Sequence, residues 1–146
     1  MQIAIGSDHA GFELKKTIIE HLTQAGHQLT DLGPEVKESV DYPDYAEKVA
    51  KSVAADVSDF GILVCGSGMG MSIAANKVAG VRAALCGNAY VSEMARAHNN
   101  ANVLCLGERI TGVGLALTIV DVFVSTKFEG GRHSRRVDKI AEIENQ

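Results

Sequence analysis

The sequence predicts an α/β protein built around a five-stranded, mostly parallel sheet. Short apolar runs typical of buried strands fall at residues 2–6, 28–32, 60–64, 81–85 and 102–106. Longer segments with helical spacing lie between these runs, as consecutive βαβ units require. The length of 146 residues suits a single domain, 1–146, that buries about two-thirds of its unfolded surface.

The first two helices are marked by apolar stripes and by the residues that bound them. A stripe at helical spacing predicts a first helix that Gly26 ends, with these residues on one face: Phe12, Ile18, Ile19, Leu22 and Ala25. The second helix is expected from about Tyr45 to Asp56, after a loop that contains Gly33-Pro34 and Tyr42-Pro43.

The later helices differ in how much of their surface is apolar. One is expected to begin near Ser72, and another to run from near Asn88 to His98. The segment from Val113 to Val124 is apolar on nearly every face, so a helix there must be buried on all sides. It is too short to cross a bilayer, which needs about 20 apolar residues. The pattern fits a helix packed between the sheet and another subunit as well as a central core helix.

Composition disfavours several classes of function. A net charge of −4 argues against general binding of nucleic acid or of an anionic membrane surface. The chain begins with a strand-like run, so we expect no signal peptide and a cytoplasmic location. The chain has neither a CxxC motif nor a His-rich spacing, so we expect no structural metal site. The three cysteines, Cys65, Cys86 and Cys105, are expected to be reduced.

A predicted strand ends at a thiol and continues into a glycine-rich turn, Cys65-Gly66-Ser67-Gly68-Met69-Gly70. Its spacing fits neither a P-loop, which needs a lysine here, nor a dinucleotide-binding loop. A cysteine phosphatase would place an arginine where Met71 stands. Two interpretations remain equally favoured by the loop alone. Its amides hold a small oxyanion beside the thiol, or it is a tight packing turn with a buried cysteine.

Other candidate groups are expected at the same edge of the sheet, because ligands of open α/β sheets lie outside the carboxyl ends of the strands. Asp8 and His9 follow the first strand, and Glu108 and Arg109 follow the fifth. Tyr42 is expected in a loop near this edge. Taken singly, an Asp-His pair is more often a helix cap with a solvated imidazole, and the tyrosine a packed aromatic ring.

His98 and Asn99 are expected to lie far from Cys65 of their own chain, because the preceding helix carries the chain roughly 15 Å back along the sheet. If His98 is catalytic, it most simply serves the site of a partner subunit in a symmetric dimer. Otherwise the segment is a polar helix end without a chemical role.

The tail, residues 127–146, is basic in an otherwise acidic chain. Arg132 and Arg136 are four residues apart, so they share one helical face, which suits a phosphate monoester. The alternative is a solubilising charged helix. Nucleic acid is disfavoured, because no aromatic residues accompany the charges.

Six segments carry a more specific signal, at residues 6–12, 41–45, 65–70, 72–77, 97–103 and 130–133. They include Gly6-Ser7-Asp8-His9, the glycine-rich turn and Ala97-His98-Asn99-Asn100. Together, and over essentially the whole length, they resemble the type B ribose-5-phosphate isomerases. The resemblance implies a Rossmann-like three-layer sandwich and an aldose–ketose isomerase of the pentose phosphate pathway without cofactor or metal. It also implies a homodimer with shared active sites, and leaves open whether dimers pair into tetramers.

The resemblance further implies a role for each candidate residue. Cys65 is the base that moves a proton between C1 and C2 of the sugar, and the amides of residues 66–70 hold the enediolate oxygen. Ser67 supplies a hydroxyl in this loop, and His98 from the neighbouring subunit opens the sugar ring. Asp8, which we group with the catalytic residues, contacts the sugar. The other implied contacts are with the substrate for His9, Tyr42, Gly66, Gly68, Met69, Gly70 and Asn99, and with its phosphate for Arg109, Arg132 and Arg136.

Relatives with other activities are weighed against this interpretation. Some family members use a carboxylate as base, whereas Ala74 and Ala75 offer none, so the chain resembles the cysteine branch. Galactose-6-phosphate isomerases resemble it in the glycine loop but lack the ring-opening histidine and the arginine tail. An isomerase of a hexose 6-phosphate, of the allose or galactose type, and a non-catalytic sugar-phosphate-binding module remain as alternatives. A cysteine hydrolase is disfavoured by Met71.

Overall fold

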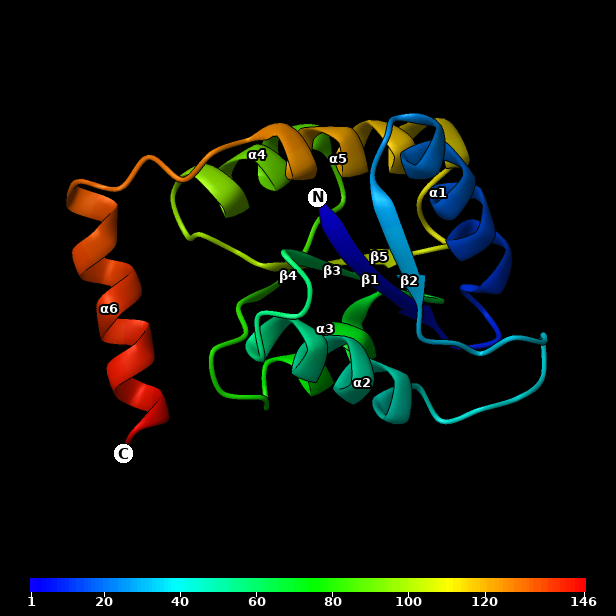
Figure 1. The fold of residues 1–146 in the computed structure, drawn as a ribbon, viewed down its shortest axis with the longest axis horizontal. Helices are drawn as coiled ribbons and strands as arrows, with labels where there is room; N and C mark the ends of the chain where they lie inside the picture. Colours follow the sequence, from blue (N-terminus) through cyan, green and yellow to red (C-terminus); the bar gives the residue numbers. More distant parts are fainter.

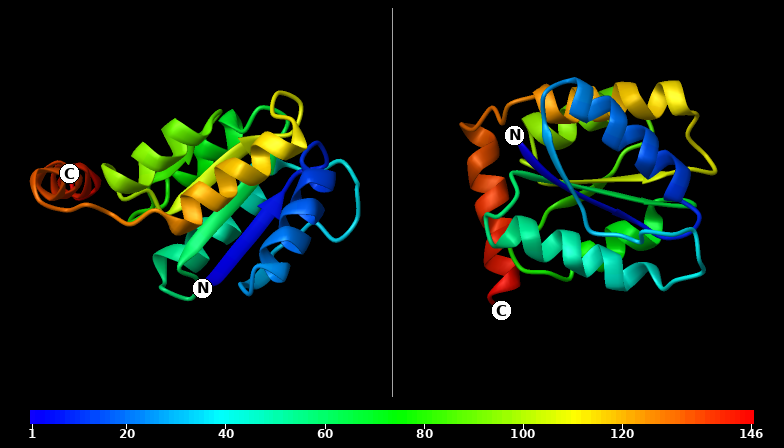
Figure 2. Two further views of the ribbon diagram at one scale, coloured as in Figure 1. Left: turned by 90° about the horizontal axis from the view of Figure 1, so that it is seen from above. Right: turned by 45° about the vertical axis from the view of Figure 1, so that its right-hand side comes forward.

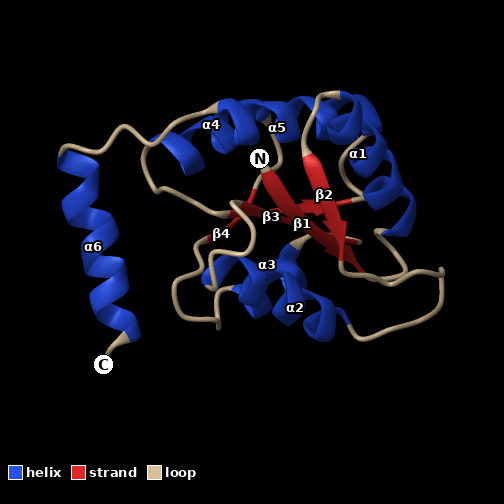
Figure 3. Ribbon diagram, in the orientation of Figure 1, coloured by secondary structure: helices blue, strands red, loops and turns tan.

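The computed structural model describes residues 1–146 as a three-layer sandwich with one parallel sheet between two layers of helices (Figure 3). The strand order is β2-β1-β3-β5-β4, and every neighbouring pair is parallel. The strands are β1 Gln2–Ser7, β2 Gln28–Asp31, β3 Phe60–Cys65, β4 Ala83–Leu85 and β5 Val103–Gly107. The helices are α1 Phe12–Gln24, α2 Tyr42–Ala54, α3 Met69–Ala75, α4 Ala89–Ala97, α5 Val113–Ser125 and α6 Arg132–Glu144. The predicted fold class is confirmed.

The core lies on both faces of the sheet, because alternate strand residues point to opposite faces. Ile3 and Ile5 of β1 pack under α1, α4 and α5, in a cluster that includes Phe123. Ala4 points to the other face, where α2 and α3 cover it. Figure 1 shows these two helical layers above and below the sheet.

The strand order places a crevice between β1 and β3. The chain leaves β1 for β2 on one side and returns to β3 on the other, so the order reverses between these strands. Ser7 pairs with Val64, and Cys65 pairs with Gly107, at the carboxyl ends of the strands. The fold therefore brings Asp8 and Cys65 to the topological switch point.

Two helices begin earlier than the sequence predicts. Helix α2 begins at Tyr42, three residues before the predicted start, because Pro43 fits the first turn of a helix, where no N–H partner is required. Tyr42 is thus a helical residue and not part of a loop. Helix α3 begins at Met69, within the glycine-rich turn, whereas the pattern predicted a start near Ser72.

Helix α5 is only partly buried within one chain. Ala116, Ile119 and Phe123 face the core, but Val113 is 54% and Leu115 44% exposed. The expectation of burial on all sides is therefore not met by a single chain, because no other element covers the outer face of this apolar helix.

Helix α6 stands apart from the sandwich, on the side opposite the loop between β2 and α2 (Figures 1 and 2). Its far end is joined to the body by Glu144, whose carboxylate accepts hydrogen bonds from the Gly80 N–H at 3.1 and 3.0 Å. Ile140 and Ile143 on this helix are exposed. None of the helices combines the length and the hydropathy needed to span a bilayer.

Candidate active site

A cleft of about 580 Å³ lies at the carboxyl ends of β1 and β3. It brings together nine of the predicted site residues: Asp8, His9, Tyr42, Cys65, Gly66, Ser67, Met69, Gly70 and Arg109. Ala10, Ile73 and Ile110 also line it, and sequence reasoning did not find them. These three are apolar and carry no chemical signal. Their part in the cleft depends on how α3 and the β5–α5 loop are placed.

The Cys65 thiol lies at the inner end of this cleft and is 5% exposed. Its Sγ accepts a hydrogen bond from the Gly68 N–H at 3.1 Å. Gly68 can turn its amide toward the sulfur because it adopts a φ of 76°, a conformation that other residues rarely adopt. The glycine-rich turn therefore places a backbone donor directly against the thiol.

The loop after Cys65 carries backbone amides without partners. The N–H groups of Gly66, Ser67 and Gly70 donate to no group of the chain, whereas Met69 N–H donates to Ser67 Oγ at 3.2 Å. Free amides at the first turn of a helix can bind an anionic oxygen. The structure thus favours the oxyanion-binding interpretation of the glycine-rich turn over a purely packing turn.

Two glycines of the loop allow side chains to approach closely. A Cβ on Gly70 would lie 2.7 Å from the Tyr42 ring, and one on Gly66 would lie 3.2 Å from Nη1 of Arg109. Arg109 is positioned by its own N–H, which donates to the Gly66 carbonyl at 3.1 Å. An aromatic ring and a guanidinium group therefore flank the free amides, and the guanidinium can form charge-assisted hydrogen bonds with an anionic ligand.

Asp8 and Glu108 both hold the start of α1. Asp8 Oδ1 accepts hydrogen bonds from Ala10 N–H at 2.9 Å and Gly11 N–H at 3.0 Å, while Oδ2 makes no hydrogen bond within the chain. Glu108 Oε2 accepts from Leu14 N–H at 3.1 Å and does not line the cleft. The carboxylate of Asp8 thus holds the turn that leads into α1 and has one oxygen left for a ligand.

His98, Asn99, Arg132 and Arg136 do not line the Cys65 cleft of their own chain. His98 caps the end of α4, and Asn99 lines a second cleft, of about 460 Å³, which lies against α6. Arg132 and Arg136 are exposed on α6. This separation agrees with the geometric argument that His98 cannot reach its own Cys65.

The imidazole rings of His98 and His133 stack with centroids 4.1 Å apart. The pKa of His133 is lowered, first by burial and then by the positive charges of His98 and Arg132. Sequence reasoning placed no role on His133 or on its neighbour Glu129.

The other two cysteines are unlike Cys65. Cys86 and Cys105 are buried, and neither lines the cleft. Burial raises the pKa of Cys86 to about 11 and that of Cys105 well above its ordinary value. All three cysteines are free, in agreement with the expected reduced state.

A thiol among free amides, at the switch point of a parallel sheet, defines an α/β enzyme that acts on a small, oxygen-rich ligand. Residues 3–140 match the model of the Ribose/Galactose Isomerase family, and the chain belongs to that family. The relationship indicated by the six sequence segments is therefore confirmed.

Individual relatives cover nearly the whole chain. Ribose-5-phosphate isomerase B of Escherichia coli is 48% identical over 99% of this chain and 97% of its own length. The structure of Clostridium thermocellum ribose-5-phosphate isomerase B is 53% identical, with a TM-score of 0.98 over 99% of this chain and 98% of that chain. The Mycoplasma genitalium enzyme, solved with bound ribulose-5-phosphate, is 48% identical with a TM-score of 0.96, over 99% of this chain and 97% of that chain.

Proposed function

We propose that this protein interconverts ribose 5-phosphate and ribulose 5-phosphate through an enediolate, with Cys65 as the base. The observation that carries this proposal is the thiol beside a loop of free amides, with the Gly68 N–H aimed at Sγ at 3.1 Å. The family and the ribulose-5-phosphate bound to the Mycoplasma genitalium relative support the choice of sugar.

In the proposed reaction the Cys65 thiolate takes the proton from C2 of the open-chain aldose. The C–H electron pair forms the C1–C2 double bond, and negative charge moves to O1, where the amides of Gly66, Ser67 and Gly70 stabilise it. The thiol then returns the proton to C1 while the proton on O2 moves to O1, so that C2 becomes the carbonyl carbon of the ketose and C1 carries a hydroxyl. A sugar C–H is far less acidic than a thiol, so most of the catalysis must come from these donors; losing one commonly costs about a hundredfold or more in rate.

We further propose a homodimer in which each cleft receives residues from the partner. His98 would open the sugar ring, Asn99 would bind the sugar, and Arg132 and Arg136 would join Arg109 on the phosphate. Their position outside the Cys65 cleft of their own chain supports this arrangement, as do the exposed apolar residues of α5 and α6. The three free cysteines support a cytoplasmic location, where thiols stay reduced.

The activity is tested by assaying purified protein with ribose 5-phosphate in the presence of EDTA. Cys65→Ala should abolish nearly all turnover while the circular dichroism spectrum is unchanged. Cys86→Ala is the matched control, because it removes a buried thiol outside the cleft. Full activity in Cys65→Ala would remove the thiol from the mechanism.

The same assay separates the alternatives. A panel of pentose and hexose phosphates, including allose 6-phosphate and galactose 6-phosphate, shows whether a six-carbon sugar is preferred. Tight binding of several sugar phosphates without turnover would indicate a non-catalytic binding module.

The shared site is tested by mixing inactive Cys65→Ala and His98→Asn chains. After random exchange, half of the dimers are mixed and each has one intact site, so about a quarter of the wild-type activity is expected. No recovery after demonstrated exchange would place both residues in the site of one chain.

A further inference from the structure

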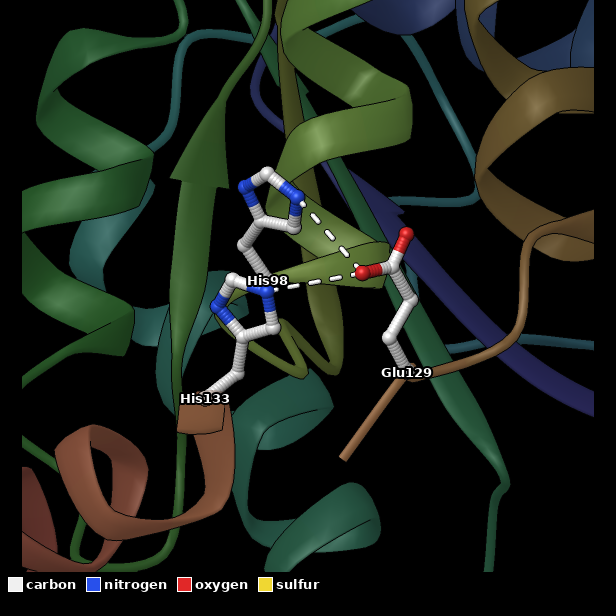
Figure 4. Close-up of side chains that lie close together, drawn as sticks. All are labelled: His98, Glu129 and His133. Atoms are coloured by element: carbon white, nitrogen blue, oxygen red, sulfur yellow. Dashed lines mark ion pairs between the residues drawn. The ribbon is translucent and has the colours of Figure 1, made fainter. Parts of the chain in front are cut away.

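Three side chains outside the Cys65 cleft converge on one point. His98 Nε2 lies 3.8 Å and His133 Nε2 3.4 Å from the same carboxylate oxygen of Glu129 (Figure 4). The two rings are stacked with an interplanar angle of 10°, so their Nε2 atoms face the carboxylate side by side. The three atoms that can act as ligands all lie within 4.8 Å of one another.

The backbone of three separate segments fixes this arrangement. His98 N–H donates to the Met94 carbonyl at 2.9 Å at the end of α4. Glu129 N–H donates to the Ala97 carbonyl at 3.0 Å, which ties the linker before α6 to the residue next to His98. His133 N–H donates to the Gly130 carbonyl at 3.1 Å. The cluster is therefore set by the fold and not by the side chains alone.

The separations match those around a metal ion better than those of direct hydrogen bonds. Hydrogen bonds between nitrogen and oxygen are about 2.7–3.2 Å long, and both histidine–carboxylate distances exceed this range. Bonds of about 2.0–2.1 Å to a tetrahedral Zn²⁺ place neighbouring ligand atoms roughly 3.3 Å apart. Because the two rings are almost parallel, one ring must turn toward the other before both nitrogen lone pairs point to one ion.

Burial and charge determine which ion fits. The side chain of His133 is 8% exposed, whereas those of His98 and Glu129 are 36% and 57% exposed, so one side remains open for a water as fourth ligand. Two imidazoles and one carboxylate suit Zn²⁺ or Co²⁺ better than Mg²⁺ or Ca²⁺. The charges of Arg132 and Arg136 act on His133 and oppose a cation, and the Glu129 carboxylate offsets them.

We propose that His98, Glu129 and His133 form a site for a divalent ion of the Zn²⁺ class, and that its occupation inhibits the isomerase. A nitrogen bound to a metal ion cannot also exchange a proton with the sugar ring, so the ion withdraws His98 from ring opening. In the shared-site dimer, the ion bound to one chain inhibits isomerisation in the Cys65 cleft of the partner chain. The inhibition rests on the proposed role of His98, whereas the metal site itself does not.

Metal binding is tested first in the Cys65→Ala variant, which removes the thiol of the active site as a competing ligand. Titration with CoCl₂, followed by visible absorption, and with ZnCl₂, followed by calorimetry, should each give one ion per chain. Adding His133→Asn or Glu129→Gln should weaken binding by more than about tenfold, the range reached by loss of even an outer-shell partner. His27→Asn, which removes a histidine near the N-terminus, should leave binding unchanged. Absent binding, or binding that neither cluster variant weakens, overturns the proposal.

Inhibition is tested next, with ribose 5-phosphate as substrate. ZnCl₂ should inhibit the enzyme, EDTA should restore it, and Glu129→Gln and His133→Asn should each raise the inhibitory concentration more than about tenfold relative to their own metal-free rates. Equal inhibition of all three proteins would assign the effect to Cys65 and overturn the inhibitory role. One-ion binding by the cluster in a protein without isomerase activity would instead support the site and contradict the proposed function.

Discussion

Gly68 has the least room for a side chain among the three glycines of the glycine-rich turn. An added Cβ would lie 2.5 Å from Leu85 Cδ1 and 2.8 Å from the Leu106 carbonyl carbon, on a backbone with a φ of 76°. We predict that Gly68→Ala lowers the free energy of unfolding by about 1–3 kcal/mol and impairs turnover, because the amide that faces the thiol must move.

Gly114→Ala is the matched control, since nothing lies within 4 Å of a Cβ added to this glycine of α5. Its stability should stay the same or rise by up to about 1 kcal/mol. Urea unfolding of both variants measures the difference. Equal stabilities would mean that the turn tolerates a side chain.

The thiols of the chain are expected to differ in reactivity. The thiolate is the form that alkylates, and burial raises the pKa of Cys86 to about 11, so almost none of it is ionised near neutral pH. We predict that iodoacetamide at about pH 8 modifies Cys65 and spares Cys86 and Cys105 in the folded protein. Labelling of Cys86 should increase as the pH rises toward about 11. Mass spectrometry of peptides identifies the site, and early labelling of Cys86 would contradict the prediction.

Single site residues could be predicted from the sequence where they are close together in the chain. Cys65 and the loop that faces it are consecutive, so the strand, the thiol and the glycines could be recognised together. Glu129 and His133 could not be linked to His98, because a separation of about 30 residues follows no spacing rule. Their convergence depends on the backbone bond between Glu129 and Ala97.

The position of helix α1 depends on a buried lysine. Lys15 is 1% exposed, and its Nζ lies 2.9 Å from Asp31 Oδ1 and donates to the Pro34 carbonyl at 2.6 Å. We predict that Lys15→Met lowers the free energy of unfolding by about 1–3 kcal/mol, because that carbonyl and Asp31 lose their partner. The adjacent exposed Lys16→Met should change stability by less than about 0.5 kcal/mol.

Thermal or urea denaturation compares the two lysine variants. A Lys15→Met protein as stable as the wild type would indicate that packing of the methionine compensates for the lost hydrogen bonds.

The burial of Lys15 could not be predicted from the apolar stripe, because hydropathy patterns assign lysine to the exposed face. The partners that offset its charge are 16 and 19 residues away in the chain.

The whole molecule is asymmetric, with the basic face of α6 held away from the sandwich. If this face completes the phosphate site of a partner, changing both Arg132 and Arg136 to Gln should raise KM for ribose 5-phosphate by at least about tenfold. Each charge-assisted hydrogen bond is worth about 1.5–3 kcal/mol. Arg135→Gln, which removes an exposed charge between them, should have a much smaller effect.

Steady-state kinetics with ribose 5-phosphate separates these variants, with circular dichroism as the check on folding. An unchanged KM in the double variant would indicate a solubilising helix.

The alternation of strand and helix patterns predicted the sheet and its class. The place of α6 could not be predicted, because an amphipathic helix shows that it has an apolar face without showing what that face contacts.

The strand order also determines when the sheet can be completed as the chain is synthesised. Strand β4 pairs only with β5, which follows it in sequence but lies between β3 and β4 in the sheet. A nascent chain can pair β1, β2 and β3 early, whereas residues 83–85 must wait until residues 103–107 have emerged. The contact beneath the glycine-rich turn also forms only after β5 has emerged, because Gly107 of β5 packs against Ser67. The thiol at the end of β3 is thus in place early, and the loop around it takes its final shape only after β5 has joined the sheet.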